Sequence, residues 1–132
     1  IDDLRSAKLS NFELFAQLMD NAAYRANLFG DISAITQSNR MSVVATLLER
    51  RDWHERMLNG SDYPLPGVVP LISLKALVDW RLLDASTVEP LRRLRDINVL
   101  LYDFVLKRSL NKEDQGFAKP VFETAPFFSR PA

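Results

Sequence analysis

The feature that most restricts the fold is a strand, helix, strand order between residues 27 and 60. A short apolar run at 27–32 is followed by Met41, Val44 and Leu48 at helical spacing, and then by a second short run at 56–60. About two dozen residues separate the two runs, which is far too many for a hairpin and enough for a helical crossover. The pattern therefore predicts a parallel β–α–β unit and the fold class α/β.

Helix-start signals mark most of the remaining elements. Ser10 and Glu13 form a capping box that predicts a helix over 11–22, and Asn98 can cap a last helix that ends near Leu110. Apolar spacing predicts a helix from Pro70 to about Arg81. A second capping box at 86–89 predicts a short helix that ends near Arg95.

The sequence divides at residue 110. Residues 111–132 contain three prolines, four phenylalanines and no hydrophobic period, so we expect an extended C-terminal tail that packs its aromatic rings on the body or on a partner. Residues 1–110 then hold all the β–α units. Two buried strands alone would leave both sheet edges bare. We therefore expect a segment of a larger α/β protein, or one part of an oligomer.

Composition narrows the classes of function. Lysine plus arginine equals aspartate plus glutamate at 17 each, so the formal net charge of zero predicts neither nucleic acid nor an anionic membrane as a partner. The sequence has no cysteine, which excludes disulfides, cysteine-ligated zinc and a thiol nucleophile, and fits a reducing cytoplasm. The longest apolar neighbourhood, 64–74, is broken by three prolines and a glycine, so no membrane span is expected.

Asp62 is the residue that most invites a chemical role. It follows the run at 56–60, where Gly60 permits a close turn and Pro64 stops further pairing. The carboxyl ends of parallel strands are where sites are built in α/β folds. Asp62 is therefore either a turn cap or a metal ligand and general base.

Three stretches resemble the C-terminal part of metal-dependent hydrolases of the amidohydrolase superfamily, which are (β/α)8 TIM barrels. They are Asn27-Leu28-Phe29-Gly30-Asp31-Ile32-Ser33-Ala34, then Leu47-Leu48-Glu49-Arg50, and finally Arg56-Met57-Leu58-Asn59-Gly60-Ser61-Asp62-Tyr63-Pro64. The last stretch contains the G-[ST]-D-x-P motif that closes the final barrel strand in that family. The resemblance covers most of residues 10–110.

The resemblance implies roles for four residues. Asp62 would be the last-strand aspartate, which binds a divalent metal and acts as general base towards the hydrolytic water. Zinc is the metal we expect first. Asp31 and Ser33 would end the preceding strand and face the same site, where a small-molecule substrate binds. Tyr63 would lie on the rim of that site.

The chain departs from the family pattern in its histidines. The family uses a His-x-His pair on the first strand and further histidines on middle strands, whereas this sequence has one histidine, His54, expected at the surface or at a cap. The resemblance therefore implies the last two strands and closing helices of a barrel. The missing N-terminal portion, another chain or a homo-oligomer would complete it. We expect neither a bound metal nor activity from this chain alone.

Two other functions stay open. A lyase such as a decarboxylase of the same superfamily would use the same aspartate. A non-catalytic helical interaction module would use the phenylalanines of the tail, Phe117, Phe122, Phe127 and Phe128, as anchors. Glycine-rich phosphate loops and a Gly-x-Ser-x-Gly nucleophile elbow are absent from the sequence.

Overall fold

A computed structural model describes residues 9–131 of the chain, and it is rich in helix. The helices are α1 (Asn11–Asp20), α2 (Met41–Glu49), α3 (Leu74–Asp79), α4 (Val88–Ile97), α5 (Val99–Ser109) and α6 (Ala125–Phe128). The strands are β1 (Gly30–Asp31), β2 (Met57–Leu58), β3 (Asn111–Lys112) and β4 (Gln115–Gly116). Short 3-10 turns join them: η1 (Ala22–Tyr24), η2 (Ser38–Arg40), η3 (Arg51–Arg56), η4 (Leu65–Gly67), η5 (Val69–Leu71), η6 (Ala85–Thr87) and η7 (Lys119–Val121).

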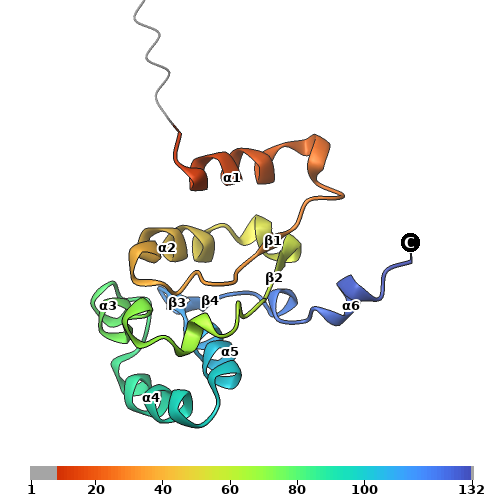
Figure 1. Cartoon of the computed structure of the whole chain (residues 1–132). Coiled ribbons are helices and arrows are strands. Elements are labelled where there is room, and N and C mark those ends of the chain that lie inside the picture. The colour runs from red at the N-terminus through yellow and green to blue at the C-terminus, as the bar shows by residue number, and fades with distance from the viewer. Residues whose placement is uncertain (1–8, 132) are drawn as a thin grey trace, which may run out of the picture.

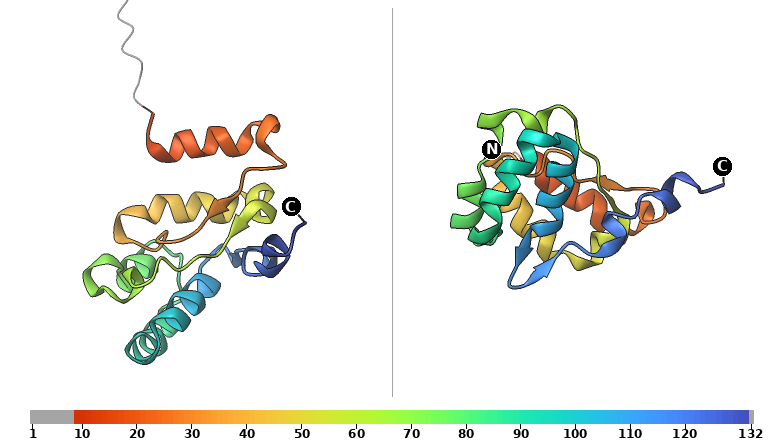
Figure 2. Two further views of the ribbon diagram at one scale, coloured as in Figure 1. Left: turned by 45° about the vertical axis from the view of Figure 1, so that its right-hand side comes forward. Right: turned by 90° about the horizontal axis from the view of Figure 1, so that it is seen from below.

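The elements lie in layers. Helix α1 lies along one side of the layer that contains α2, β1 and β2, and α4 and α5 lie on the opposite side (Figures 1 and 2). The C-terminal α6 projects beside the strands, away from α3 and α4 (Figure 1). Among residues 9–131, no helix is long and apolar enough to cross a bilayer.

The predicted parallel strand pair is confirmed. β1 pairs with β2 in parallel, with Gly30 opposite Met57 and Asp31 opposite Leu58. Each strand has only two residues, so both are shorter than the predicted runs at 27–32 and 56–60. Ile32 N–H extends the pairing by donating to the Leu58 carbonyl at 2.9 Å. The crossover between them is α2, as the helical spacing predicted.

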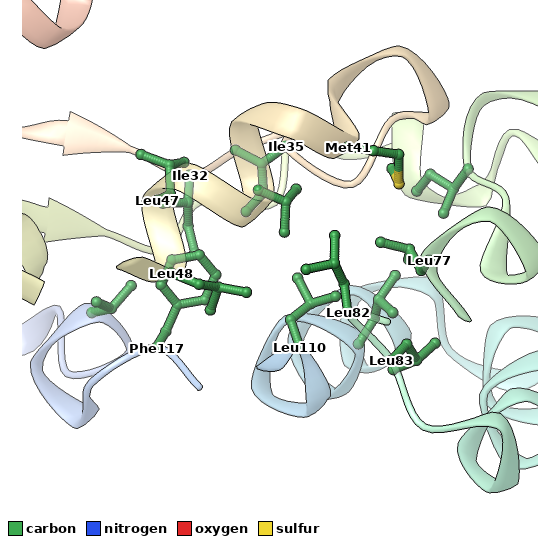
Figure 3. Close-up of a cluster of buried hydrophobic side chains, with 14 of the residues drawn as sticks. Ile32, Ile35, Met41, Leu47, Leu48, Leu77, Leu82, Leu83, Leu110 and Phe117 are labelled. Atoms are coloured by element: carbon green, nitrogen blue, oxygen red, sulfur yellow. The ribbon is translucent and has the colours of Figure 1, made fainter. Parts of the chain in front are cut away.

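One continuous apolar core joins α2 to the C-terminal half of the chain. Figure 3 shows the apolar side chains of α2 beside Leu77 of α3 and close to the side chains that follow it in the chain. These are Leu82, Leu83, Leu110 and Phe117. Ile32, Val44, Leu77 and Leu106 are fully buried in this cluster. Full burial of such a side chain contributes about 1.5–3 kcal/mol, so these contacts hold the layers together.

Two predicted helix caps are confirmed. Glu13 N–H donates to Ser10 Oγ at 3.2 Å, and Ser10 N–H donates to Glu13 Oε2 at 2.6 Å, which completes the capping box of α1. Leu101 N–H donates to Asn98 Oδ1 at 2.9 Å at the start of α5. These caps satisfy backbone donors that have no partner inside the helix.

The capping box predicted at 86–89 is wrong. Asp84 accepts from Ser86 N–H at 2.8 Å, and the Thr87 hydroxyl donates to the Asp84 carbonyl at 2.7 Å. The chain therefore enters α4 through the η6 turn, because the Asp84 carboxylate takes the Ser86 N–H that the Glu89 side chain would bind in a capping box. The helix predicted from Pro70 also begins later, at Leu74, where Ser73 Oγ accepts from Ala76 N–H at 3.1 Å.

Residues 111–131, expected as an extended tail, contain short elements of regular structure. Strands β3 and β4 form an antiparallel hairpin, and η7 and α6 follow it. The hairpin turn is made by Glu113 and Asp114, whose positive φ angles of 52° and 65° suit a tight two-residue connection. Val121 is fully buried, and its carbonyl accepts from Asn59 N–H at 2.9 Å, so the segment covers the outer edge of β2. The domain division at residue 110 stays a prediction.

Candidate functional site

The carboxyl ends of β1 and β2 carry a small hydrogen-bonded cluster. Asp31 Oδ1 accepts from Ser33 N–H at 2.8 Å, from the Ser33 hydroxyl at 2.7 Å and from Gly60 N–H at 3.0 Å. Because β1 and β2 run in parallel, the backbone after each strand reaches the same edge of the sheet. Two of the residues predicted to face the site, Asp31 and Ser33, therefore lie together and are tied to the segment that leads to Asp62.

Gly60 is required by this close approach. A Cβ atom on Gly60 would lie 2.5 Å from Ser33 Oγ and 2.7 Å from Asp31 Oδ2. Such contacts are shorter than van der Waals separation, so any side chain here would displace the carboxylate. The glycine thus lets the backbone after β2 touch the polar end of β1.

Asp62 and Tyr63 follow in an exposed turn. Asp62 has a φ of 54°, in the left-handed region that aspartate tolerates better than most residues. Its carbonyl accepts from Leu65 N–H at 3.0 Å, and Ser61 Oγ accepts from Tyr63 N–H at 3.3 Å. Tyr63 is 64% exposed. Within residues 9–131, the Asp62 carboxylate has no hydrogen-bond donor.

A buried ion pair lies behind this turn. Lys107 Nζ donates to Asp103 Oδ2 at 2.8 Å, and both side chains come from α5. The same ammonium donates to the Gly60 carbonyl at 2.6 Å. Lys107 and Asp103 are 0% and 1% exposed, so this charge pair is almost fully removed from water. Asp103 Oδ1 is buried and has no partner among the described residues.

Burial raises the pKa of the Asp103 carboxyl above its ordinary value, because the charged form loses hydration. The Lys107 ammonium acts in the opposite direction through its charge and its hydrogen bond. The Asp31 carboxylate adds to the rise.

Sequence reasoning did not identify Asp103 or Lys107 as part of this region. The available signal was their i, i+4 spacing on a helix that is otherwise mostly apolar between Leu100 and Leu110. Nothing in the sequence relates that helix to Gly60, because the contact joins residues 47 positions apart.

Asp31 and Ser33 also line a hollow of about 540 Å³ between α1 and the end of β1. Phe12, Phe15 and Val43 form part of its apolar wall. Asp62 and Tyr63 are not among the residues that line this hollow. Asp31 and Ser33 therefore face the hollow, whereas Asp62 lies in the exposed turn after Gly60.

His54 has a structural role and is not at the surface as expected. It is 1% exposed; its Nε2 lies 2.8 Å from the Leu47 carbonyl, and its Nδ1 accepts from Ala118 N–H at 3.1 Å. Burial lowers the pKa of His54, and the nearby Arg51 charge acts in the same direction. These contacts fix a neutral imidazole that joins η3 to the C-terminal segment.

The described residues do not by themselves fit a metal ion. Between residues 9 and 131, no three His, Cys, Asp or Glu side chains gather where they could hold one. Asp62 offers a single carboxylate, and structural or catalytic metal sites need three or four protein ligands. Any metal at this edge would need ligands from beyond the described chain.

Comparison with known proteins gives no relative for this chain. No protein-family model, no curated protein and no solved structure matches it.

Proposed function

We propose that this chain is the C-terminal part of a metal-dependent hydrolase of the amidohydrolase superfamily, in which Asp62 is the last-strand aspartate. The other metal ligands would come from a missing N-terminal barrel portion or from another chain. Zinc is the ion we expect in the completed site. The substrate would be a small molecule with a hydrolysable bond.

The observation that carries the proposal is the parallel pair β1–β2 with its polar cluster. Asp31 at the end of β1 accepts from Gly60 N–H after β2 at 3.0 Å, and Asp62 follows two residues later. In barrels of parallel strands, active sites are built at this edge. A sequence motif and a strand arrangement that agree are stronger support than either feature alone.

The chemistry required of Asp62 matches its surroundings. Its side chain is exposed and accepts no hydrogen bond from residues 9–131, so the carboxylate is available to take a proton from an attacking water. Asp31 differs, because three donors already occupy one of its oxygens. Asp31 and Ser33 are therefore suited to orienting a substrate, with Tyr63 at the rim.

A lyase of the same superfamily remains an alternative, since a decarboxylase would use the same aspartate on a carbon acid. The test is a panel of amides, esters and lactones alongside a panel of carboxylic acids. Hydrolysis of the first panel supports the hydrolase, and release of carbon dioxide from the second supports the lyase.

The decisive experiment is native mass spectrometry of the purified protein with zinc, followed by the activity panels. We expect an assembly heavier than the 15.1 kDa chain, with zinc bound. Asp62→Asn is the matched variant, because asparagine also tolerates a positive φ and should preserve the turn. It should lower zinc occupancy and reduce hydrolysis at least 100-fold. A heavier assembly in which Asp62→Asn leaves zinc occupancy and hydrolysis unchanged contradicts the proposal. A metal-free, inactive monomer would mean an isolated C-terminal piece, because this chain alone is expected to bind no metal and to have no activity.

A second candidate, a helical interaction module, is supported by an exposed apolar stripe on the chain. Leu100, Leu101 and Phe104 are 52%, 46% and 39% exposed and lie at helical spacing along α5, and Ile97 at the end of α4 is 82% exposed. Two of the phenylalanines expected as anchors do not serve this role, because Phe117 is buried and Phe122 packs against Phe104 and Phe117. A heavier assembly in which Asp62→Asn changes neither zinc occupancy nor activity favours this module.

A further inference from the structure

The inference concerns the contact between α5 and the turn that contains Asp62. Lys107 Nζ lies 2.6 Å from the Gly60 carbonyl oxygen and 2.8 Å from Asp103 Oδ2, and its side chain is fully buried. A lysine in such a place gives up its hydration, which costs several kcal/mol before any contact is counted. The structure therefore keeps a costly group where α5 meets the backbone directly after β2.

Gly60 is held from both sides. Its N–H donates to Asp31 Oδ1 at 3.0 Å, and its carbonyl accepts from Lys107. The two bonds fix the residue that stands two positions before Asp62. The direction in which the turn leaves β2 is then set by Asp31 on one side and Lys107 on the other.

We infer that Lys107, oriented by Asp103, is a positioning residue that holds the Gly60 carbonyl and thereby fixes the Gly60–Pro64 turn that presents Asp62. The inference rests on the proposed function for the role of Asp62. It goes further by assigning two residues of α5, which the family motif does not include, to the geometry of the site.

Stability alone does not account for the arrangement. A buried ion pair is often no more stabilising than an apolar pair of similar volume. Lys75 and Asp79 on α3 have the same residue types at the same spacing, with Nζ 2.6 Å from Asp79 Oδ2, yet both side chains are exposed. Only the pair on α5 adds a hydrogen bond to the candidate turn.

The test compares two double variants that differ by one hydrogen-bond donor. Asp103→Asn with Lys107→Gln removes both charges and keeps an N–H donor for the Gly60 carbonyl. Asp103→Asn with Lys107→Met removes both charges and that donor. Lys75→Met with Asp79→Asn is the matched control on α3.

Amide hydrogen exchange measured by NMR is the first readout. Gly60 N–H and Leu65 N–H report on the turn, because their acceptors are Asp31 and the Asp62 carbonyl. Val44 and Leu48 report on α2 and on global opening. In the Met variant, exchange of the two turn amides should rise at least tenfold relative to the Gln variant, with the α2 amides within twofold. The α3 control should leave every turn amide unchanged.

Hydrolysis by an active assembly of the chain is the second readout, and the exchange comparison decides the contact where no such assembly forms. The Met variant should lower kcat about 10–100-fold relative to the Gln variant while KM stays within twofold, because misplacement of a catalytic group by about 1 Å has an effect of this size. A purely structural role for Lys107 predicts a common rise in the exchange of turn and α2 amides and no selective loss of kcat.

The possible results separate this inference from the proposed function. Equal turn exchange in the Gln and Met variants overturns the positioning role, whatever Asp62→Asn does. If the turn amides exchange faster in the Met variant but Asp62→Asn changes neither zinc occupancy nor hydrolysis, Lys107 holds the turn but the turn has no role in catalysis. If the Met variant fails to fold, the double variant Asp103→Leu with Lys107→Met replaces it with an apolar pair. Exchange of its turn and α2 amides is then compared with that of the Gln variant, and equal turn exchange again overturns the positioning role.

Discussion

At the scale of single residues, Gly60 sets the tightest constraint. Replacement by alanine would put a Cβ atom 2.5 Å from Ser33 Oγ and 2.7 Å from Asp31 Oδ2. We expect Gly60→Ala to lower the free energy of unfolding by about 1–3 kcal/mol, as overpacking does. Gly67→Ala is the control, because the atoms nearest to its Cβ would be those of the Val99 side chain, at 3.1 Å and beyond. Urea denaturation of both variants checks the prediction, and equal losses would contradict it.

We expect His54 to make the free energy of unfolding depend on pH. Its pKa is lowered in the folded protein by burial, so the unfolded chain binds more protons below about pH 6.5. The stability linked to neutral His54 is therefore fully present above that pH and is lost as the pH falls through the lowered pKa. The loss should be steepest at roughly 1.4 kcal/mol per pH unit, the limit for one proton.

Urea midpoints between pH 5 and pH 7.5 measure this effect. The variant His54→Asn has no group that titrates in this range, so its midpoint should fall less steeply than that of the parent chain. Parallel slopes for the two proteins would show that His54 does not carry the acid sensitivity.

Sequence reasoning expected Asp31 and Ser33 to face the same site as Asp62, and that role stays a prediction. The two residues lie together at the end of β1 and are hydrogen-bonded to each other and to Gly60, whereas Asp62 does not line the hollow that they border. Lys107 and Asp103 were missed because their role depends on a contact that no local pattern encodes. His54 was expected at the surface or at a cap because it precedes the strand at the end of a predicted helix, yet its ring is hydrogen-bonded to Leu47 and Ala118.

At the scale of elements, the predicted helix caps at Asn98 and Ser86 can be compared, because the first is present in the structure and the second is not. Asn98 Oδ1 accepts from Leu101 N–H at 2.9 Å, whereas the Ser86 side chain has no such role at the start of α4. We expect Asn98→Ala to destabilise the protein by about 1 kcal/mol. Ser86→Ala should change stability by less than about 0.5 kcal/mol, as surface substitutions do. Thermal unfolding of the two variants distinguishes them, and a larger loss for Ser86→Ala would refute the assignment.

Helices were easier to predict than strands for a physical reason. A helix repeats its apolar face over several turns, so α2 and α5 could be read from periodicity and a cap. Strands β1 and β2 have two residues each, which is too short for any period, and only their apolar character and separation revealed them. The β3–β4 hairpin gave no signal, because its turn uses Glu113 and Asp114 in place of the Asn-Gly pair that usually marks such turns.

At the scale of the whole molecule, the C-terminal segment belongs to the folded body. Val121 is fully buried, and its carbonyl pairs with Asn59 beside β2. We expect Val121→Ala to lower the free energy of unfolding by about 2 kcal/mol through loss of core contacts. Phe128→Ala, at a side chain that is 76% exposed, should cost less than about 0.5 kcal/mol. Chemical denaturation tests the pair; similar small losses would mean that the segment is only loosely attached.

The overall arrangement was predicted only at the level of class. The parallel pair and its α2 crossover followed from the spacing of apolar runs, since few connections of that length are possible. The placement of α4 and α5 on the side of the strand layer opposite α1 did not follow, because it depends on how the core side chains of distant segments fit together (Figures 1 and 3). The exposed stripe on α5 likewise became visible only once that packing was known.

The burial of Lys107 gives the chain an uneven chemical reactivity. The sequence has five lysines, and acylating reagents attack the unprotonated amine only when it meets solvent. Lys75 and Lys119 have side chains that are 81% and 80% exposed, whereas Lys107 is 0% exposed and hydrogen-bonded twice. Brief acetylation followed by peptide mapping should therefore leave Lys107 unmodified until α5 separates from Gly60. The extent of acetylation at Lys107 then measures how often the contact between α5 and the Gly60–Pro64 turn opens.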